Sequence, residues 1–403
     1  MGEDSQPQTR LWTRNFVLAI VTNLFISMVF YLLMTSMALY AVERFQASDS
    51  AAGFASSAFI VGSMVARLFA GRLLDTLGRR RVLLASLAVF VVASLLYLPA
   101  NTLGLLLALR FVHGLAFGAG NTAIAAAVQT LIPPARRSEG TGYFGLSATL
   151  ATALGPSLAI QLSSNGEYEG IFYFCAASSV ISLIIAFTLR LPERVRSPGK
   201  HSGHHEPSRR SRLSALLDPD ALPIASVIFV VGLAYSGILA FLVSYAKARG
   251  MSDSAGIFFL LYAAAVLASR LFVGRIQDRR GDNSVMYPTL AFFALGLAML
   301  ALEPSVWSIG LAGILVGFGF GALLPCAQTI AVTAVPPARM GTGISTFYFM
   351  LDAGTGLGPV VLGALVPVLG YAGMYGALSL LMCSAVLLYF LVHGRTHRGP
   401  RRA

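Results

Sequence analysis

Asp352 is the residue whose type and position most clearly allow chemistry. It lies about eleven residues into the apolar segment 341–366, whereas the other acids fall in loops, tails or segment ends. At about 1.5 Å per residue, this position is near the middle of a bilayer. Charges at that depth are costly and usually functional. We therefore predict that Asp352 binds and releases a proton. The alternative is a structural acid held by hydrogen bonds.

His113 is the second candidate for proton binding. It is the only histidine within the apolar regions, and Arg110 lies three residues earlier on the same helix face. An imidazole titrates near neutral pH, which suits a proton site. A histidine that only packs within the protein is the alternative.

Polar and aromatic side chains are scattered along the other apolar segments. A mostly apolar cavity with a few polar groups suits a small amphipathic or zwitterionic molecule. Each such residue can instead form an interhelical hydrogen bond, so we expect about half to line a cavity. The predicted binding residues are Asn23, Tyr31, Arg110, Asn121, Tyr143, Tyr235, Gln328, Tyr348 and Asp352.

The composition indicates that membrane helices position these residues. The chain has 403 residues, of which 56% are hydrophobic and 11% charged, and a mean hydropathy of +0.74. Soluble proteins carry about a quarter charged residues. The net charge of +12 alone would suggest nucleic acid, but the basic residues fall in every second loop, as short cytoplasmic connections predict. We therefore expect a lipid bilayer, and no nucleic acid, as the partner of this charge.

The pattern predicts an all-α membrane protein with twelve spans. The first six lie at about 16–42, 51–72, 82–100, 102–131, 140–162 and 170–190. The last six lie at about 221–246, 252–274, 285–302, 306–334, 341–366 and 371–393. We predict an N-terminal six-helix bundle (1–190), a cytoplasmic linker (191–219) and a C-terminal bundle (220–403), with both termini cytoplasmic. Arg67 and Arg270 lie one turn before basic loops, close enough to the inner face to extend toward water.

The two bundles repeat one unit. Gly71 and Asp75 recur 203 residues later as Gly274 and Asp278, and the PPAR at 133–136 recurs at 336–339 with the same offset. Gly140-Thr141-Gly142 recurs as Gly341-Thr342-Gly343, slipped by two residues. Matches at one offset indicate duplication. Units with an even number of spans insert in the same orientation, as in transporters whose halves rock about a central site.

The chain resembles the major facilitator superfamily of transporters. GRLLDTLGRRRVL (71–83) is similar to the family's loop between spans two and three, and Thr76 departs from it. RFVHGLAFG (110–118) resembles the fourth-span motif, and GLSATLATALGPSLA (145–159) the fifth-span antiporter motif. STFYFMLDAGTGLGPVVLG (345–363) is similar to bacterial drug-efflux relatives, including sugar-efflux-like proteins and opine-metallophore exporters.

A gating role follows from these motifs. Asp75 can meet the positive N-terminal end of a helix from the other half, at Gly341 and Thr342. Arg79–Arg81 and Glu139 can add ion pairs around it. Such a cluster would close the cytoplasmic side in one state; a loop that only sets topology is the alternative. The predicted gating residues are Gly71, Asp75, Gly78, Arg79, Arg80, Glu139, Gly155, Pro156, Gly274, Asp278, Gly358 and Pro359.

We therefore predict a monomeric transporter of the cytoplasmic membrane that exports a small molecule, of the multidrug or metallophore kind, by proton antiport. Proton-coupled uptake of a sugar or organic acid is one alternative, and a sensor or scaffold without transport is another. The three scattered cysteines lack a metal-site pattern, and no Walker loop occurs. The linker histidines His201, His204 and His205 could bind a metal weakly, but the composition around them is typical of a disordered segment. We expect no enzyme activity, no cofactor and no metal.

Overall fold

The computed structural model describes residues 10–163, 168–191, 216–302 and 305–395, and within these ranges every element is helical. Most of the predicted linker, including the three linker histidines, lies outside the described residues. The N-terminal half contains α1 (Arg14–Phe45), α2 (Asp49–Leu77), α3 (Arg79–Leu96), α4 (Leu103–Leu131), η1 (Pro134–Arg136), α5 (Arg137–Leu162) and α6 (Glu169–Thr188). The C-terminal half contains α7 (Leu222–Ala248), α8 (Ser252–Arg280), α9 (Asn283–Ala301), α10 (Val306–Ala334), η3 (Pro337–Arg339), α11 (Met340–Tyr389) and the π-helix η4 (Phe390–Gly394).

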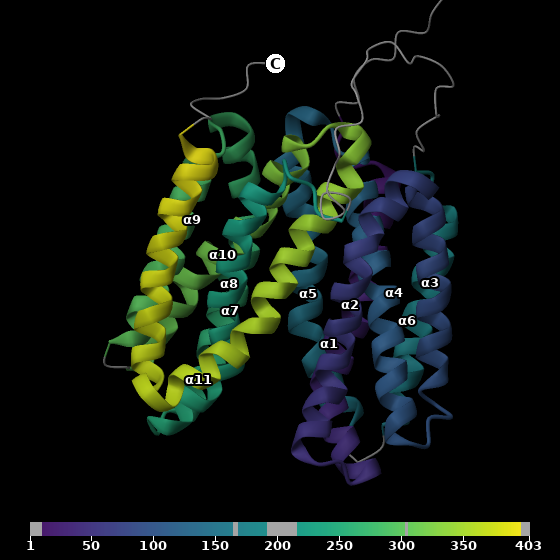
Figure 1. The fold of residues 1–403 in the computed structure, drawn as a ribbon, viewed down its shortest axis with the longest axis horizontal. Helices are drawn as coiled ribbons and strands as arrows, with labels where there is room; N and C mark the ends of the chain where they lie inside the picture. The colour runs from purple at the N-terminus through teal and green to yellow at the C-terminus, as the bar shows by residue number, and fades with distance from the viewer. Residues whose placement is uncertain (1–9, 164–167, 192–215, 303–304, 396–403) are drawn as a thin grey trace, which may run out of the picture.

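Helix α11 has two arms. Gly370 has φ 66° and ψ 174°, which is not helical, and the chain turns back there in Figure 1. Glycine adopts a positive φ without the steric penalty that a Cβ imposes. With the arms counted separately, the described residues form twelve long helices. Nine of the helices in the described ranges, α11 taken as one, are long and apolar enough to cross a membrane.

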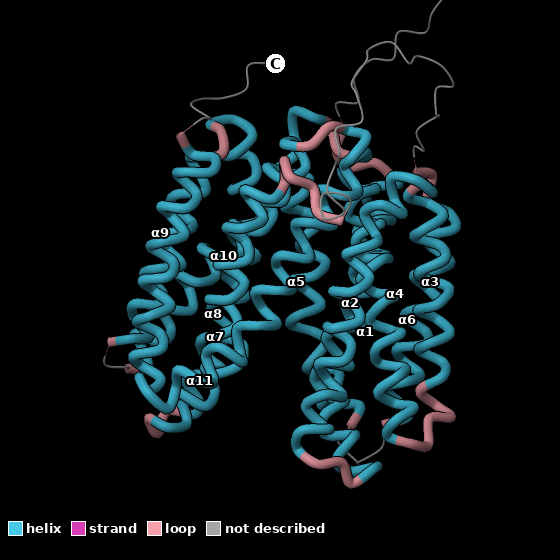
Figure 2. The backbone as a smooth tube through the Cα atoms, in the orientation of Figure 1, coloured by secondary structure: helices cyan, strands magenta, loops and turns pink. Residues whose placement is uncertain are grey.

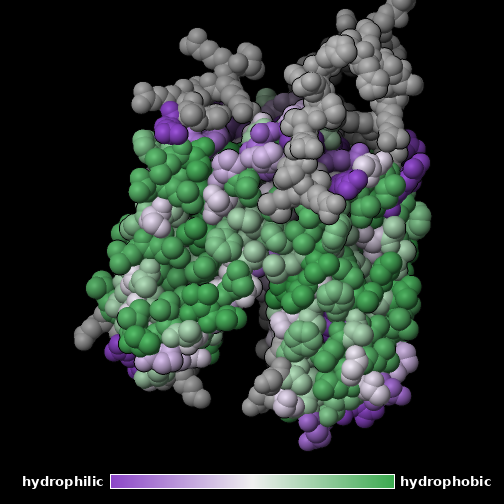
Figure 3. Space-filling model, in the orientation of Figure 1, coloured by the Kyte–Doolittle hydropathy of each residue, from purple (hydrophilic) through white to green (hydrophobic). Residues whose placement is uncertain are grey.

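Each half has its own hydrophobic core. One cluster of buried side chains runs from Leu11 to Leu191 and also includes Val332, Met340 and Ile344 of the other half, and the second runs from Ala221 to Tyr389. The outer surface is also apolar, with Trp307 89% exposed and Val368 79% exposed. Figure 3 shows this hydrophobic surface over both halves. An apolar exterior around these packed cores fits a helical protein surrounded by lipid.

The halves meet at one face and part at the other. We call the meeting face the basic face; it carries Arg79, Arg136, Arg275, Arg279 and Arg339 at the ends of α2, α4, α8 and α10. We call the opposite face, with the connections at 46–48 and 249–251, the open face. Figures 1 and 2 show the helices of the two halves diverging toward the open face, and Figure 3 shows the hollow between them.

Several helices extend beyond their predicted spans. Helix α8 continues to Arg280, past the predicted end at residue 274, and α5 begins at Arg137, before the predicted start at residue 140. Hydropathy marks only the apolar part of a helix, whereas backbone hydrogen bonding continues through the polar turns. These extensions carry the charged residues that join the halves at the basic face.

Candidate functional site

An ion pair joins the two halves inside the bundle. Arg67 of α2 pairs with Asp352 of α11, and the two side chains are 5% and 19% exposed. Ser63 Oγ, one turn before Arg67, lies 3.4 Å from Asp352 Oδ2 and donates to it. The acid predicted to bind a proton therefore lies at the interface between the halves, paired with a cation of the other half.

The prediction that Arg67 reaches toward water at the inner face is wrong. Arg67 is 4% exposed and points between the halves. Its guanidinium donates to the backbone carbonyl of Tyr348 at 3.1 Å and lies 4.8 Å from the ring centroid of that tyrosine. Arg270 is also buried, at 9% exposure. By facing α11, Arg67 gains Asp352 as a buried partner, which an arginine facing lipid lacks.

A buried chain of polar side chains continues from Arg67 into the N-terminal half. Arg67 donates to Asn121 Oδ1 at 3.4 Å, and Asn121 Nδ2 donates to Asn23 Oδ1 at 3.0 Å. Asn23 Nδ2 donates to Ser147 Oγ at 2.7 Å. The chain thus joins α11, α2, α4, α1 and α5 through predicted binding residues. Buried polar networks of this kind fix the relative positions of helices, because each member depends on its neighbours.

Aromatic and amide side chains of the C-terminal half form a second group. Tyr348 OH donates to Gln328 Oε1 at 3.4 Å. Tyr262 OH donates to Tyr235 OH at 3.0 Å, and the Tyr235 ring stacks on Phe320 with centroids 3.7 Å apart. Tyr262 was absent from the sequence prediction; its place eight residues before Arg270 on α8 could have indicated it.

Two predicted residues lie away from the interface. His113 is fully buried in the N-terminal half, with its ring nitrogens 3.3 Å from Ser94 Oγ and 3.1 Å from Tyr97 OH. The Arg110 guanidinium donates to the backbone carbonyls of Ala55 at 2.8 Å and Ser56 at 3.2 Å. Both side chains bond within the N-terminal half and do not meet Asp352, and Arg110 Nη1 is buried without a hydrogen-bond partner among the described residues. Their roles in proton and solute binding stay predictions.

Tyr143 is also not in the central group. Its hydroxyl accepts a hydrogen bond from Arg275 at 2.9 Å, and its ring lies 5.0 Å from that of Trp12. Tyr143 begins α5 near the basic face, so its hydroxyl meets the extended end of α8. Tyr31, by contrast, is half-buried on α1, where its Cβ lies 2.7 Å from the position that a Cβ on Gly155 would take.

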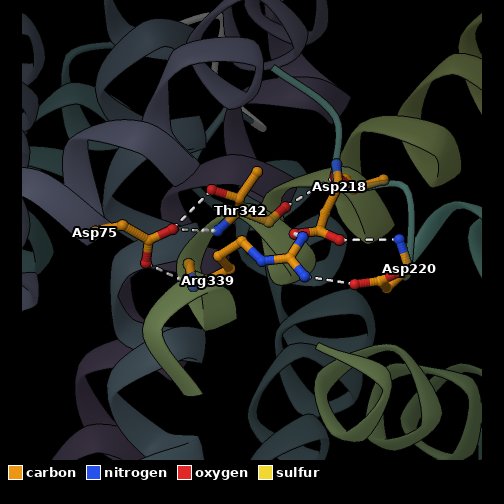
Figure 4. A network of polar contacts seen from close by, with 7 residues as sticks. Asp75, Asp218, Asp220, Arg339 and Thr342 are labelled. Carbon is orange, nitrogen blue, oxygen red and sulfur yellow. Dashed lines mark hydrogen bonds and ion pairs between the residues drawn. The ribbon is translucent and has the colours of Figure 1, made fainter. Parts of the chain in front are cut away.

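The predicted contact of Asp75 is confirmed. Its carboxylate accepts hydrogen bonds from the backbone N–H of Gly341 at 3.0 Å and of Thr342 at 3.1 Å, and from the Thr342 hydroxyl at 2.7 Å. These N–H groups belong to the first turn of α11, where helical partners are missing and the helix dipole favours an anion. Figure 4 shows Asp75 reaching Thr342 across the interface.

The repeat produces a second, equivalent cap. Asp278 of α8 accepts from the backbone N–H of Ser138 and of Glu139 at the start of α5, both at 3.0 Å. Ser138 and Glu139 lie 203 residues before Gly341 and Thr342. The structural repeat therefore keeps the offset of 203, and the two-residue slip of the Gly-Thr-Gly sequence has no counterpart in the contacts.

Glu139 joins this second cap, whereas the sequence placed it around Asp75. It pairs with Arg136 at 2.6 Å and with Arg275 of the other half at 2.7 Å. On the first loop, Arg79 approaches Met340 Sδ at 3.8 Å, and Arg80 donates to the Phe187 carbonyl at 3.2 Å. Basic side chains lie at both caps, and the second cap also holds the ion pair between Glu139 and Arg275 of the two halves.

Glycines allow the close approach at both caps. A Cβ on Gly71 would lie 2.6 Å from Thr342 Cα, and one on Gly274 would lie 2.6 Å from Glu139 Cα. Gly78 has φ 92° at the turn between α2 and α3, where its freedom is required. Gly358 packs against Ser236 of α7, and the helices continue through Gly358-Pro359 and Gly155-Pro156. The side chain of Pro156 lies outside the described residues.

A further network fixes the start of α7 to the α11 cap. Arg339 pairs with Asp218 at 2.7 Å and with Asp220, and the Asp218 backbone N–H donates to Thr346 Oγ1 at 2.8 Å. Figure 4 shows this group beside Asp75 and Thr342. It holds the turn preceding α11 rigidly within the C-terminal half, so that the amides capped by Asp75 are presented in a fixed orientation.

Removing either cap should loosen the basic face locally. In Asp278→Asn we expect faster hydrogen–deuterium exchange at the amides of residues 138–139, and in Asp75→Asn at residues 341–342. Losing a cap costs about 0.5–2 kcal/mol, which corresponds to roughly two- to thirtyfold faster exchange. Glu169→Gln is the control, because Glu169 is an exposed acid at the start of α6 and belongs to neither cap. Unchanged exchange in both cap variants would contradict this assignment.

Comparisons with known proteins agree with this geometry. The family model described as Major Facilitator Superfamily matches residues 19–359 and 253–403. An uncharacterised MFS-type transporter of Burkholderia mallei is 27% identical over 345 residues, covering 83% of this chain and 80% of the relative. One from Pseudomonas aeruginosa is 25% identical over 368 residues, covering 86% and 85%.

Solved structures share the fold. The human organic anion transporter MFSD10 has a TM-score of 0.79 at 20% identity, covering 93% of this chain and 98% of that one. The proton:xylose symporter XylE has a TM-score of 0.73 at 13% identity, covering 94% of both chains. FucP in the outward conformation has a TM-score of 0.71 at 16% identity, covering 94% and 99%.

Proposed function

Because this chain belongs to the Major Facilitator Superfamily and is therefore a multi-pass membrane transporter, we propose that it exports a small amphipathic or zwitterionic molecule by proton antiport. The observation that carries the proposal is the ion pair between Arg67 and Asp352, which joins the two halves deep inside the bundle. A carboxylate in this position links its own protonation to the contact between the halves.

The orientation of the protein in the membrane follows from the distribution of its arginines. Arginines gather at the basic face, and short loops rich in arginine stay in the cytoplasm. We therefore assign the basic face and both termini to the cytoplasmic side of the inner membrane, with the open face outside. The arrangement described above is then the outward-facing state, held closed inside by Asp75, Asp278 and the central ion pair.

The proposed cycle is a competition for Asp352. Ionised Asp352 holds Arg67 and keeps the basic face closed. A proton that enters from the open face neutralises the carboxylate, and Arg67 then loses its counter-charge in a poorly solvated interface. The halves rock apart at the basic face, and the proton leaves to the cytoplasm. The positive group of the solute then pairs with the ionised Asp352 in place of the proton. When the halves close again at the basic face, the solute is carried outward.

Polar groups beside the ion pair would orient the solute. Tyr31, Tyr235, Gln328 and Tyr348 supply hydroxyl and amide groups within mostly apolar helices, as binding cavities commonly do. Asn23 and Asn121 support Arg67 from behind and hold it in position for Asp352. The binding role of these residues is part of the proposal.

Vesicles containing the purified protein test the function. With an inward-directed proton gradient set across the membrane, a transported solute should cause proton movement opposite to its own. The probes are drug-like amines, amino-acid-derived zwitterions, sugars and organic acids, each followed with a pH-sensitive dye. Proton and solute moving together would replace export with uptake by symport. No solute-dependent proton movement with any probe would indicate a sensor or scaffold.

A further inference from the structure

The two interface arginines occupy equivalent positions of the repeat but differ in their partners. Arg270 lies 203 residues after Arg67, and each points from its own half toward the first helix after the basic-face turn of the other half. Arg67 meets Asp352 on α11. The equivalent of Asp352 on α5 is Thr149, which cannot neutralise a cation. The duplication has therefore kept both cations and only one counter-charge.

Arg270 is buried without a charged partner. It is 9% exposed, and its guanidinium lies directly against Gly145 of α5, where a Cβ would collide with it. Within the described ranges it forms no hydrogen bond or ion pair, and its Nε is among the buried atoms that lack an acceptor. A buried cation without a partner is costly, so its retention calls for an anion that is present for part of the cycle.

Gln328 supplies a second, independent donor without an acceptor. This side chain is 6% exposed, and its Oε1 accepts from Tyr348 OH at 3.4 Å. Its Nε2 has no partner among the described residues. Gln328 is on α10, which packs along α8, the helix that carries Arg270, and the Tyr348 ring that bonds to Gln328 lies 4.8 Å from the Arg67 guanidinium. The two groups here that lack a partner in the described part of the chain, Arg270 Nε and Gln328 Nε2, are both N–H donors. An oxyanion such as a carboxylate would accept hydrogen bonds from both.

From this we propose that Arg270 and the Gln328 amide form a subsite between the halves for a carboxylate of the transported molecule. The inference deepens the proposed function and rests on it: it makes the solute a zwitterion with an aromatic or apolar body, whose positive group meets Asp352, and it excludes a simple cation. The apolar body would lie against the tyrosines beside this subsite, because Tyr262 lies about two turns before Arg270 on α8 and bonds to Tyr235. The bound carboxylate then gives Arg270 the counter-charge that Thr149 does not supply.

Charge-matched probes test the subsite in the full-length protein in lipid nanodiscs. Benzoate, benzyl alcohol and benzylammonium share a ring and differ in charge. We expect benzoate to bind and to raise the thermal unfolding temperature, and the other two at equal concentration to have much smaller effects. In Arg270→Gln the Kd for benzoate should rise about tenfold or more, because a charged hydrogen-bond donor is lost. Gln328→Leu should weaken benzoate binding less, and Arg270→Lys should retain part of it.

The stability of the ligand-free protein separates binding from a structural role. If Arg270 serves a ligand, Arg270→Gln should unfold at the same temperature as the unaltered protein or higher, because an unpaired buried charge is removed. Arg67→Gln should unfold at a lower temperature, because it leaves Asp352 unpaired. Arg280→Gln is the matched control: it removes the same charge from an exposed position of the same helix, and benzoate binding should not change.

Two results would overturn the subsite. One is benzoate binding that is unchanged in Arg270→Gln, and the other is benzylammonium binding as tightly as benzoate. The outcome is separate from that of the vesicle experiment. If benzoate binding depends on Arg270 but no solute moves protons, the subsite stands and antiport is wrong. If solute-dependent proton movement occurs and Arg270→Gln binds benzoate normally, antiport stands and the subsite is wrong.

Discussion

Asp352→Asn is expected to abolish proton-coupled transport in a protein that still folds and inserts. The substitution removes the group that binds the proton and leaves Arg67 without its counter-charge. Breaking a buried pair costs about 3–5 kcal/mol, which is enough to change the occupancy of the closed basic face by about a hundredfold or more. The measurement is solute-dependent proton movement in vesicles that contain equal amounts of each variant.

Two further variants sharpen this test. Glu169→Gln is the control, because Glu169 is an exposed acid at the start of α6 and its removal should leave transport intact. Asp352→Asn combined with Arg67→Gln should recover the stability lost in the single variant, because no buried charge is left unpaired. Proton coupling should stay absent in the double variant. If Asp352→Asn alone retains flux driven by the proton gradient, this carboxylate is not the coupling site.

Gly274→Ala is expected to hold the basic face open and to inhibit transport strongly. A Cβ at this position would lie 2.6 Å from both Glu139 Cα and Ser138 O of the other half, so the halves must separate to admit it. Overpacking costs about 1–3 kcal/mol, or roughly a five- to hundredfold loss in the population of the closed state. Spin labels at the exposed positions Arg81 and Arg280, on opposite halves, should report a longer distance.

The same helix provides the control for this substitution. Gly256 lies near the open face on α8, and a Cβ there meets no atom within 4 Å. Gly256→Ala should keep both the distance and the transport rate, because it adds the same methyl group without touching the other half. Equal behaviour of the two alanine variants would show that the contact at Gly274 does not control the basic face.

The contacts of Asp75 follow from sequence because they depend on a local rule. One half carries a carboxylate at the end of a helix, and the other half carries an uncapped helix start at the matching place. The two meet whenever the topology brings these helix ends together. The duplication supplies that topology, and its offset of 203 also indicates the equivalent cap at Asp278. The positions of the long helices are readable for a similar reason, since a segment that crosses the bilayer must be mostly apolar over about 20 residues.

The direction of side chains within the bundle could not be read in the same way. Helices such as α4 and α10 carry apolar residues on every side, so periodicity does not tell which side faces lipid. For this reason the sequence led us to predict that Arg67 reaches toward water and that Arg110 binds the solute. Asn23, Asn121 and Arg67 join into one chain only because three helices cross at a particular depth, which sequence spacing does not specify.

The pH dependence of the distance between labels at Arg81 and Arg280 tests the central claim most directly, because it needs no knowledge of the solute. For these measurements the native cysteines are replaced by serine. The account predicts a short distance at alkaline pH and a growing population of longer distances as the pH falls, since protonation of Asp352 releases Arg67. In Asp352→Asn the longer distance should be present at every pH. If Asp352→Asn shows the same distances and the same pH response as the unaltered protein, the ion pair does not couple protons to the movement of the halves.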